Sequence, residues 1–302
     1  MNPKFASIDI GTNTVLLTIA ELSPINGSLT ILDDVHSIAR LGQGVDTTGK
    51  IAEEAISRVE NILKNYRTIC DEYSEITIKA VGTSCLRDAS NSREVCDRLS
   101  LAIGVSIEVL SGDEEARFCY IGTVEDDSPA TIIDIGGGST EIISGRNGTI
   151  EFGTSIDIGA VRLTERYFNE LPVSDEIIEY AKGEIYRALT SLPQFEFHAI
   201  TAVAGTPTTV AAMVLQLKDY NAELIHNYQL YYKDIQQVAT QLSTLTKEEI
   251  IALPGVHPKR ADILLAGVLL LKSIMEFSGR NVCTVSTKGL RYGVLKEMTT
   301  LL

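Results

Sequence analysis

Two short stretches of the chain each place an aspartate just before a turn of small residues. Asp9–Thr14 has the sequence DIGTNT, Asp134–Ser139 has the sequence DIGGGS, and apolar runs stand on both sides of each. Glycine lets the backbone approach a ligand closely, and successive amides in such a turn form a site for an anion. An aspartate at the strand end supplies a carboxylate of the kind that binds Mg²⁺. One copy would favour an ordinary hairpin turn, but two copies followed by hydroxyl or amide side chains favour a phosphate-binding site.

The stretch SGDEEA contains a candidate for acid–base catalysis. Ser111 followed three residues later by Glu114 is the pattern of a capping box, so Glu114 has a structural explanation. Glu115 is turned by about 100° from Glu114 around a helix and takes no part in the box. We therefore consider Glu115 as a general base, against the alternative that its carboxylate only stabilises the first helical turn.

Arg87, in TSCLRDA, is expected in a polar loop after a strand. Its planar guanidinium suits bidentate contact with phosphate oxygens, although a surface ion pair with Asp88 explains it equally well.

In AVAGTPTT a strand leads through Gly205 into a helix, and the sequence predicts Thr206 as the N-cap and Pro207 as the first helical residue. Helix N-termini attract phosphates, but every helix has one, so both interpretations stay open here.

Two later stretches, GVHPKRADI and VSTKGLRYG, combine helix-start signals with charged residues. Pro258 and Ser286 mark the expected helix starts. Arg260 and Arg291 are compatible with surface charges, and His257 is expected to be a cap or loop residue rather than a catalyst.

Strand-like and helical segments alternate along the chain, which predicts an α/β fold with a mixed sheet. The expected strands are 5–10, 15–22, 76–81, 105–110, 130–135, 141–144, 199–204 and 282–286. The expected helices are 52–73, a segment ending near 103, 174–192, 207–217, 233–245 and 258–277. Because both DIG turns open a hairpin, we also expect an internal duplication.

The composition narrows the class of protein. The chain has 302 residues, is 44% hydrophobic and carries a net charge of −14, which favours two domains of ordinary size and argues against a nucleic-acid-coating surface. Its five cysteines are scattered without a CxxC pair, so neither a disulfide framework nor a zinc site is expected. The N-terminus lacks the layout of a signal peptide and no apolar run could cross a bilayer, so we expect a cytoplasmic protein that does not bind membranes.

The motifs together resemble the exopolyphosphatase/guanosine pentaphosphate phosphatase family, in the family's order and over nearly the whole chain. They are DIGTNT, GTSCLRDASN, SGDEEA, IDIGGGSTE, SIDIGAVRL, AGTPTT, GVHPKRADILLAG and STKGLRYG. The wider resemblance is to the superfamily of actin, sugar kinases and Hsp70. It implies two ribonuclease-H-like domains with a phosphate-binding cleft between them. Domain I is expected to comprise 1–122 and about 290–302, whose helix folds back onto it, and domain II to comprise 123–289.

The resemblance also implies roles for individual residues. Glu115 corresponds to the family's general base for the attacking water, and Arg87 to a residue that holds the phosphoryl group. Asp134 and Glu141 correspond to ligands of Mg²⁺ or another divalent cation, with Asp9 close by. The implied phosphate-binding residues are Gly11, Asn13, Thr14, Gly136, Gly137, Gly138 and Ser139, and we add Gly205 and Thr206 as candidates.

The implied activity is hydrolysis of the terminal phosphoanhydride of inorganic polyphosphate, with guanosine pentaphosphate or another nucleotide as the alternative substrate. A kinase of the same superfamily and a non-catalytic sensor of a phosphorylated ligand are the alternatives from other classes. Long family members carry a helical C-terminal half that residues 1–302 do not include, which favours shorter polyphosphates or nucleotides. The family often dimerises, so a homodimer is a further expectation.

Overall fold

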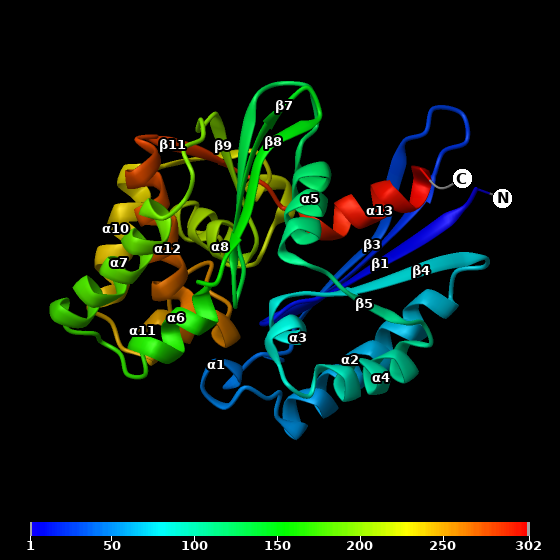
Figure 1. Ribbon diagram of the computed structural model, residues 1–302, viewed down its shortest axis with the longest axis horizontal. Coiled ribbons are helices and arrows are strands. Elements are labelled where there is room, and N and C mark those ends of the chain that lie inside the picture. Colours follow the sequence, from blue (N-terminus) through cyan, green and yellow to red (C-terminus); the bar gives the residue numbers. More distant parts are fainter. Residues whose placement is uncertain (1, 301–302) are drawn as a thin grey trace. The chain divides into compact units, whose positions relative to one another are not determined.

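The computed structural model describes residues 2–300 of the chain, and its contacts divide the chain into two compact units. Unit 1 contains the residues up to Gly122 and those from Leu290 onward, and unit 2 contains Thr123–Gly289. Each unit is built on one sheet with helices packed against it (Figure 1). The chain therefore enters unit 2 once and returns to unit 1 for its last helix.

Unit 1 has a five-stranded mixed sheet in the order β3-β2-β1-β4-β5. The central strand β1 pairs antiparallel with β2 and parallel with β4. The strands are β1 (Lys4–Ile10), β2 (Thr14–Leu22), β3 (Leu29–Ile38), β4 (Ile76–Gly82) and β5 (Ile107–Val109). The helices are α1 (Val45–Thr48), α2 (Glu53–Asp71), α3 (Ser84–Asp88), α4 (Ser92–Ile103), α5 (Gly112–Thr123) and α13 (Leu290–Thr300).

The two faces of the unit 1 sheet carry different cores, because successive residues of a strand point to opposite sides. Ala6 and Ile8 of β1 belong to a cluster with buried residues of α2 and α4. Phe5 belongs to a cluster with Phe118 of α5 and the apolar side of α13. The C-terminal helix α13, red in Figure 1, thus packs against β1, the blue N-terminal strand. Asp9 lies four residues after Phe5 in the same strand, so its side chain points to the same face as Phe5, the face that α13 covers.

Unit 2 has a six-stranded mixed sheet in the order β10-β11-β9-β6-β7-β8. Its strands are β6 (Ala130–Ile135), β7 (Thr140–Arg146), β8 (Thr149–Ile156), β9 (Ala199–Val203), β10 (Tyr228–Tyr231) and β11 (Val282–Val285). Its helices are α6 (Ala160–Tyr167), α7 (Asp175–Thr190), α8 (Gly205–Val214), α9 (Ala222–Ile225), α10 (Tyr232–Ser243), α11 (Lys247–Ile251), the 3-10 turn η1 (Pro258–Arg260) and α12 (Ala261–Ser278). Helix α12 is apolar on nearly all sides and lies in the core, where it contacts α6, α7, α8 and α10.

The two sheets repeat one topology. In each, a hairpin extends to a third antiparallel strand, and the first hairpin strand pairs in parallel with a later strand, as in β3-β2-β1-β4-β5 and β8-β7-β6-β9-β11. Strand β10 is an addition in unit 2, antiparallel to β11. The α/β class with two related mixed sheets is therefore confirmed, and the repeated topology agrees with the expected internal duplication.

Several local expectations were wrong. The supposed polar loop after β4 contains the short helix α3, which includes Arg87. Helix α8 begins at Gly205 with Ala204 in the cap position, so Thr206 is not its N-cap; the Thr206 side chain packs against Gly267 of α12 instead. Ser286 does not start a helix, because α13 begins at Leu290.

Three edge strands, β3, β8 and β10, were not predicted from the sequence. In β3 and β8 polar residues interrupt the apolar ones, and β10 has only four residues. Within residues 2–300, none of the helices combines the length and the apolar character that crossing a membrane requires.

Candidate functional site

The turn after β1 is anchored through its carbonyl groups. Gly11 N–H donates to the Thr14 carbonyl at 2.9 Å and closes the turn. The Thr12 carbonyl accepts from Gly42 N–H, and the Asn13 carbonyl accepts from the residues that follow β3, each at 2.9 Å. In a trans peptide the N–H of the next residue points opposite to the carbonyl. The amides of Asn13 and Thr14 therefore point away from the segment that anchors the turn.

The turn after β6 is built in the same way. Gly136 N–H donates to the Ser139 carbonyl at 3.0 Å. The carbonyls of Gly136 and Gly137 accept hydrogen bonds from the first residues of α6, at 2.9 and 2.8 Å. The amides of Gly137 and Gly138 consequently point to the other side of the turn, as an anion-binding nest requires. This equivalence favours the prediction that Gly11, Asn13, Thr14 and Gly136–Ser139 bind phosphate.

Gly159, just before α6, allows the second turn to be held this closely. A Cβ at position 159 would overlap the backbone of Gly137 and Gly138. The glycine in SIDIGAVRL is therefore required by the close approach of two backbone segments rather than by an unusual φ angle.

Asp134 and Glu141 are brought together by the β6–β7 hairpin. They are directly opposite each other in the antiparallel register, so both side chains stand on one face of the unit 2 sheet. Glu141 is 1% exposed, and its Oε1 accepts a hydrogen bond from the Ser155 hydroxyl at 2.6 Å. The Asp134 carboxylate lies beside it at the end of β6.

These two carboxylates fit a magnesium ion. Their donors are all oxygen, and Mg²⁺ is usually held by one or two carboxylates together with water and substrate oxygens. Among residues 2–300 there is no group of three or more His, Cys, Asp and Glu side chains that could hold a metal ion by itself. A cation at this place would therefore depend on Asp134, Glu141 and non-protein oxygens.

Asp9 occupies the position in β1 that corresponds to Asp134 in β6, but its cross-strand neighbour is Leu16 rather than a second carboxylate. On its face of the sheet lies Arg291 of α13, which is buried and is not a surface charge. Burial would lower the pKa of this guanidinium, but the charge of Asp34, with a smaller contribution from Asp9, outweighs burial and raises it. The predicted role of Asp9 near a metal ion stays a prediction.

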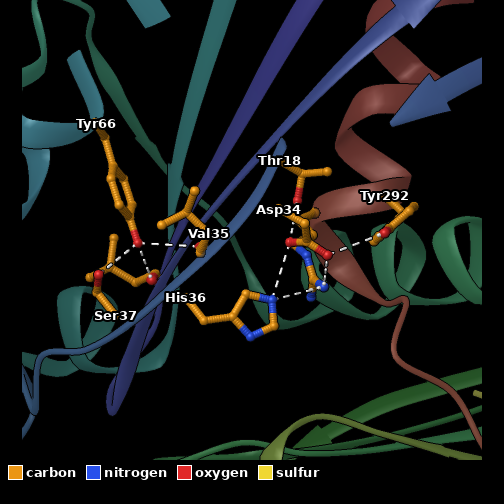
Figure 2. A network of polar contacts seen from close by, with 9 residues as sticks. Thr18, Asp34, Val35, His36, Ser37, Tyr66 and Tyr292 are labelled. Carbon is orange, nitrogen blue, oxygen red and sulfur yellow. Dashed lines mark hydrogen bonds and ion pairs between the residues drawn. The ribbon is translucent and has the colours of Figure 1, made fainter. Parts of the chain in front are cut away.

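Asp34 belongs to a polar network of β2, β3 and α13 (Figure 2), in which Arg291 is one of its partners. Arg291 Nη2 donates to Asp34 Oδ2 at 3.0 Å, His36 Nε2 lies 3.1 Å from Asp34 Oδ1, and Thr18 and Tyr292 add hydroxyl donors. Burial by itself would raise the pKa of the Asp34 carboxyl. The hydrogen bond to His36 and the charge of Arg291 outweigh burial and hold that pKa well below its ordinary value. The network fastens the first turn of α13 to the edge of the sheet.

Glu115 and Arg87 form an ion pair within unit 1. Arg87 Nη1 donates to Glu115 Oε2 at 3.0 Å and to the Leu110 carbonyl at 2.8 Å, and Glu115 is only 7% exposed. Ser111 and Glu114 form the predicted capping box, which fixes the start of α5. The structure therefore brings the two predicted catalytic residues together, with Arg87 directed at the carboxylate that Glu115 presents.

Gly205 and Thr206 lie at the same end of the unit 2 sheet as Asp134, because β9 pairs with β6 in parallel and places Val203 opposite Asp134. A Cβ at Gly205 would fall within the guanidinium of Arg260, so this arginine lies directly against the start of α8. Sequence reasoning interpreted Arg260 as a possible surface charge and did not name Ser155. The Asn147–Gly148 turn, with φ values of 51° and 70°, was the available signal that Ser155 belongs to a third strand beside Glu141.

Comparisons with known proteins identify the family to which the chain belongs. The model of the Ppx/GppA phosphatase family matches residues 19–301. Exopolyphosphatase 2 of Mycobacterium tuberculosis is 33% identical over 314 residues, covering 96% of this chain and 97% of that protein. A bifunctional 3-dehydroquinate synthase/phosphatase of Fusobacterium nucleatum is 33% identical over 308 residues, covering 97% of this chain, which spans 46% of that protein. The crystal structure of the Aquifex aeolicus Ppx/GppA family member has 30% identity and a TM-score of 0.84, with coverage of 100% and 99%.

Proposed function

The chain belongs to the Ppx/GppA phosphatase family, and we propose on that basis that it hydrolyses the terminal phosphoanhydride bond of inorganic polyphosphate. The observation that carries the proposal is the ion pair between buried Glu115, at the start of α5, and partly buried Arg87 of α3. It places a carboxylate that can take a proton beside a guanidinium that suits phosphate oxygens. The mycobacterial relative is named an exopolyphosphatase, and its similarity to this chain extends over nearly the whole length of both proteins.

In the proposed reaction, water attacks the terminal phosphorus while the bond to the bridging oxygen breaks. Glu115 takes a proton from the water, and the products are orthophosphate and a chain shorter by one phosphate. Arg87 binds phosphoryl oxygens, and the amides of each glycine turn are donors for phosphate oxygens. Asp134 and Glu141 would hold a divalent cation, which would supply positive charge for phosphate oxygens. Protein groups have little covalent chemistry to perform in phosphoryl transfer. Electrostatic stabilisation is therefore expected to provide most of the rate enhancement.

Replacing Glu115 tests the role of the base. Glu115→Gln removes the proton acceptor with little change in shape, so turnover should fall by at least ~10²-fold while substrate affinity is retained. Phosphate release from polyphosphate and substrate binding are measured side by side. Glu114→Gln is the matched control, since Glu114 serves the capping box and should leave turnover near wild type. Turnover near wild type in Glu115→Gln would remove this residue from the mechanism.

The same chemistry serves guanosine pentaphosphate, which is the second candidate substrate. A phosphate-release panel with Mg²⁺ should therefore compare triphosphate, short and long polyphosphate, ATP and guanosine pentaphosphate. A kcat/KM for polyphosphate above that of every nucleotide is the expected result. A kcat/KM higher for a nucleotide than for polyphosphate would instead identify the chain as a nucleotide phosphohydrolase.

A further inference from the structure

Three polar side chains form a row across the strands of the second glycine hairpin. Asp134 of β6 is opposite Glu141 of β7, and Glu141 is in turn opposite Ser155 of β8. Residues directly opposite in antiparallel strands share a face of the sheet, with their Cβ atoms about 4.5–5.5 Å apart. The row therefore sets a hydroxyl on the far side of Glu141 from Asp134.

The contact between Ser155 and Glu141 is that of a hydroxyl with a carboxylate. The Ser155 hydroxyl donates to Glu141 Oε1 at 2.6 Å, which is in the short range of charge-assisted O–H···O hydrogen bonds. Glu141 is almost fully buried, and a buried carboxylate needs such donors to remain charged. Because one carboxylate oxygen is held by the hydroxyl, rotation of the carboxylate about its last torsion is restricted.

The corresponding row in unit 1 lacks these features. There Asp9 is opposite Leu16, and Leu16 is opposite His36 of β3. A leucine stands where unit 2 has Glu141, and a histidine stands where unit 2 has Ser155. Of the two equivalent rows, only that of unit 2 combines two adjacent carboxylates with a hydroxyl that orients one of them.

We propose that Ser155 is a positioning residue for a divalent-cation site formed by Asp134 and Glu141. This inference rests on the proposed function, which uses a cation at these carboxylates. Ser155 acts through Glu141: its hydroxyl fixes the carboxylate in the orientation that the cation needs. Hydrogen-bond partners of metal-binding side chains typically change metal affinity by about 10–100-fold when they are removed.

Cation binding by the full chain without substrate tests the proposal. Mn²⁺ serves as a paramagnetic substitute for Mg²⁺, and bound Mn²⁺ is measured by electron paramagnetic resonance. We expect Ser155→Ala to bind Mn²⁺ about 10–100-fold more weakly than wild type. Ser155→Thr keeps the hydroxyl on a strand-compatible side chain and should restore binding. Thr154→Ala is the matched control, because Thr154 is the adjacent residue of β8, opposite Ile142, and faces the other side of the sheet.

Phosphate release separates positioning from a general structural defect. In Ser155→Ala, a raised Mg²⁺ requirement with kcat recovered at saturating Mg²⁺ is expected. Wild-type Mn²⁺ affinity in Ser155→Ala, or a loss of kcat that no Mg²⁺ concentration recovers, would overturn the role of Ser155. Wild-type protein that releases phosphate without binding Mn²⁺ would overturn this cation site but leave the hydrolase function standing. The wild-type chain could also hydrolyse no phosphoanhydride while Ser155→Ala still binds Mn²⁺ more weakly than wild type. That result would support the cation site and reject the hydrolase function.

Discussion

At the scale of single residues, Asp34 is a charged group outside the proposed catalytic residues whose pKa the fold lowers strongly. Its carboxylate is held by buried Arg291, by His36 and by the hydroxyls of Thr18 and Tyr292. Its pKa in the folded protein is lower than in the unfolded chain, where an aspartate titrates near its ordinary value of about 3.9. A lowered folded pKa means that the charged form stabilises the fold. That stabilisation is fully present above the unfolded pKa and is lost as the pH falls through the folded pKa.

Asp34→Asn should therefore destabilise the protein in a pH-dependent way. At pH 7 the loss is expected to be about 3 kcal/mol, because the buried Arg291 guanidinium keeps its burial but loses its charged partner. The difference from wild type should be constant above pH ~5 and narrow as the pH falls below ~4. Urea unfolding between pH 3 and pH 8 measures it. The same substitution at exposed Asp219 is the control, and a pH-independent difference for Asp34→Asn would contradict the argument.

At the scale of secondary-structure elements, the sequence pattern predicted the central elements well. The apolar face of 52–73 gave α2, whose buried residues include Val59, Leu63 and Tyr66. The elements it missed are those whose pattern is weak: edge strands exposed on one side, and short helices such as α3 with Arg87. The start of α8 was misplaced because Pro207 suggested a first helical turn there, whereas the helix begins at Gly205 and the Thr206 side chain packs against Gly267.

Gly159 tests how strictly the second glycine turn depends on the element that follows it. In Gly159→Ala the added Cβ would overlap the backbone of Gly137 and Gly138, so the turn or α6 must shift. We expect a loss of about 1–3 kcal/mol in the free energy of unfolding and a fall in turnover. Urea unfolding and phosphate release measure the two effects.

Gly183→Ala is the control for this prediction. Gly183 is an exposed glycine inside α7 with no heavy atom within 4 Å of an added Cβ. Alanine there should stabilise the helix by about 0.5–1 kcal/mol and leave turnover unchanged. Equal behaviour of the two variants would show that the close approach at Gly159 is not needed.

At the scale of the whole molecule, the two units have separate cores. One apolar cluster lies within unit 2, and two clusters cover the two faces of the unit 1 sheet. The last helix completes unit 1, because Val294, Leu295 and Met298 of α13 pack with Phe5 and Phe118. Residues at opposite ends of the chain therefore stabilise one sheet, the one that also presents Asp9.

Leu295→Ala should accordingly weaken unit 1 and leave unit 2 intact. Leu295 is fully buried, so truncation should cost about 2–5 kcal/mol. Native-state hydrogen exchange is expected to show reduced protection in β1, β2 and α5, with α12 unchanged. Leu101→Ala, at an 85% exposed position of α4, is the control and should change stability by less than about 0.5 kcal/mol. Equal loss of protection in both units would contradict independent cores.

The sequence by itself determined the residues on which the proposed chemistry rests and the class of fold. The duplicated DIG turns, the SGDEEA capping box and the alternating strands and helices follow from local rules of backbone geometry and periodicity. Local rules identified Asp134, Glu115 and Arg87 as candidates one at a time, whereas the role of Glu141 came from the resemblance to the family. The family of the chain could also be inferred from the sequence, because the family's motifs appear in order along it.

Only the tertiary structure decided which side chains meet. Arg87 and Glu115 come from two helices that the sheet brings together, and no spacing in the sequence states that contact. Ser155 shows the reason most clearly. A regular hairpin from the Asn147–Gly148 turn would place Thr154 opposite Glu141, but a bulge between Ser144 and Gly145 shifts the register by one residue. Because side chains alternate between the faces of a strand, that single residue brings a serine hydroxyl, instead of Thr154, to the carboxylate.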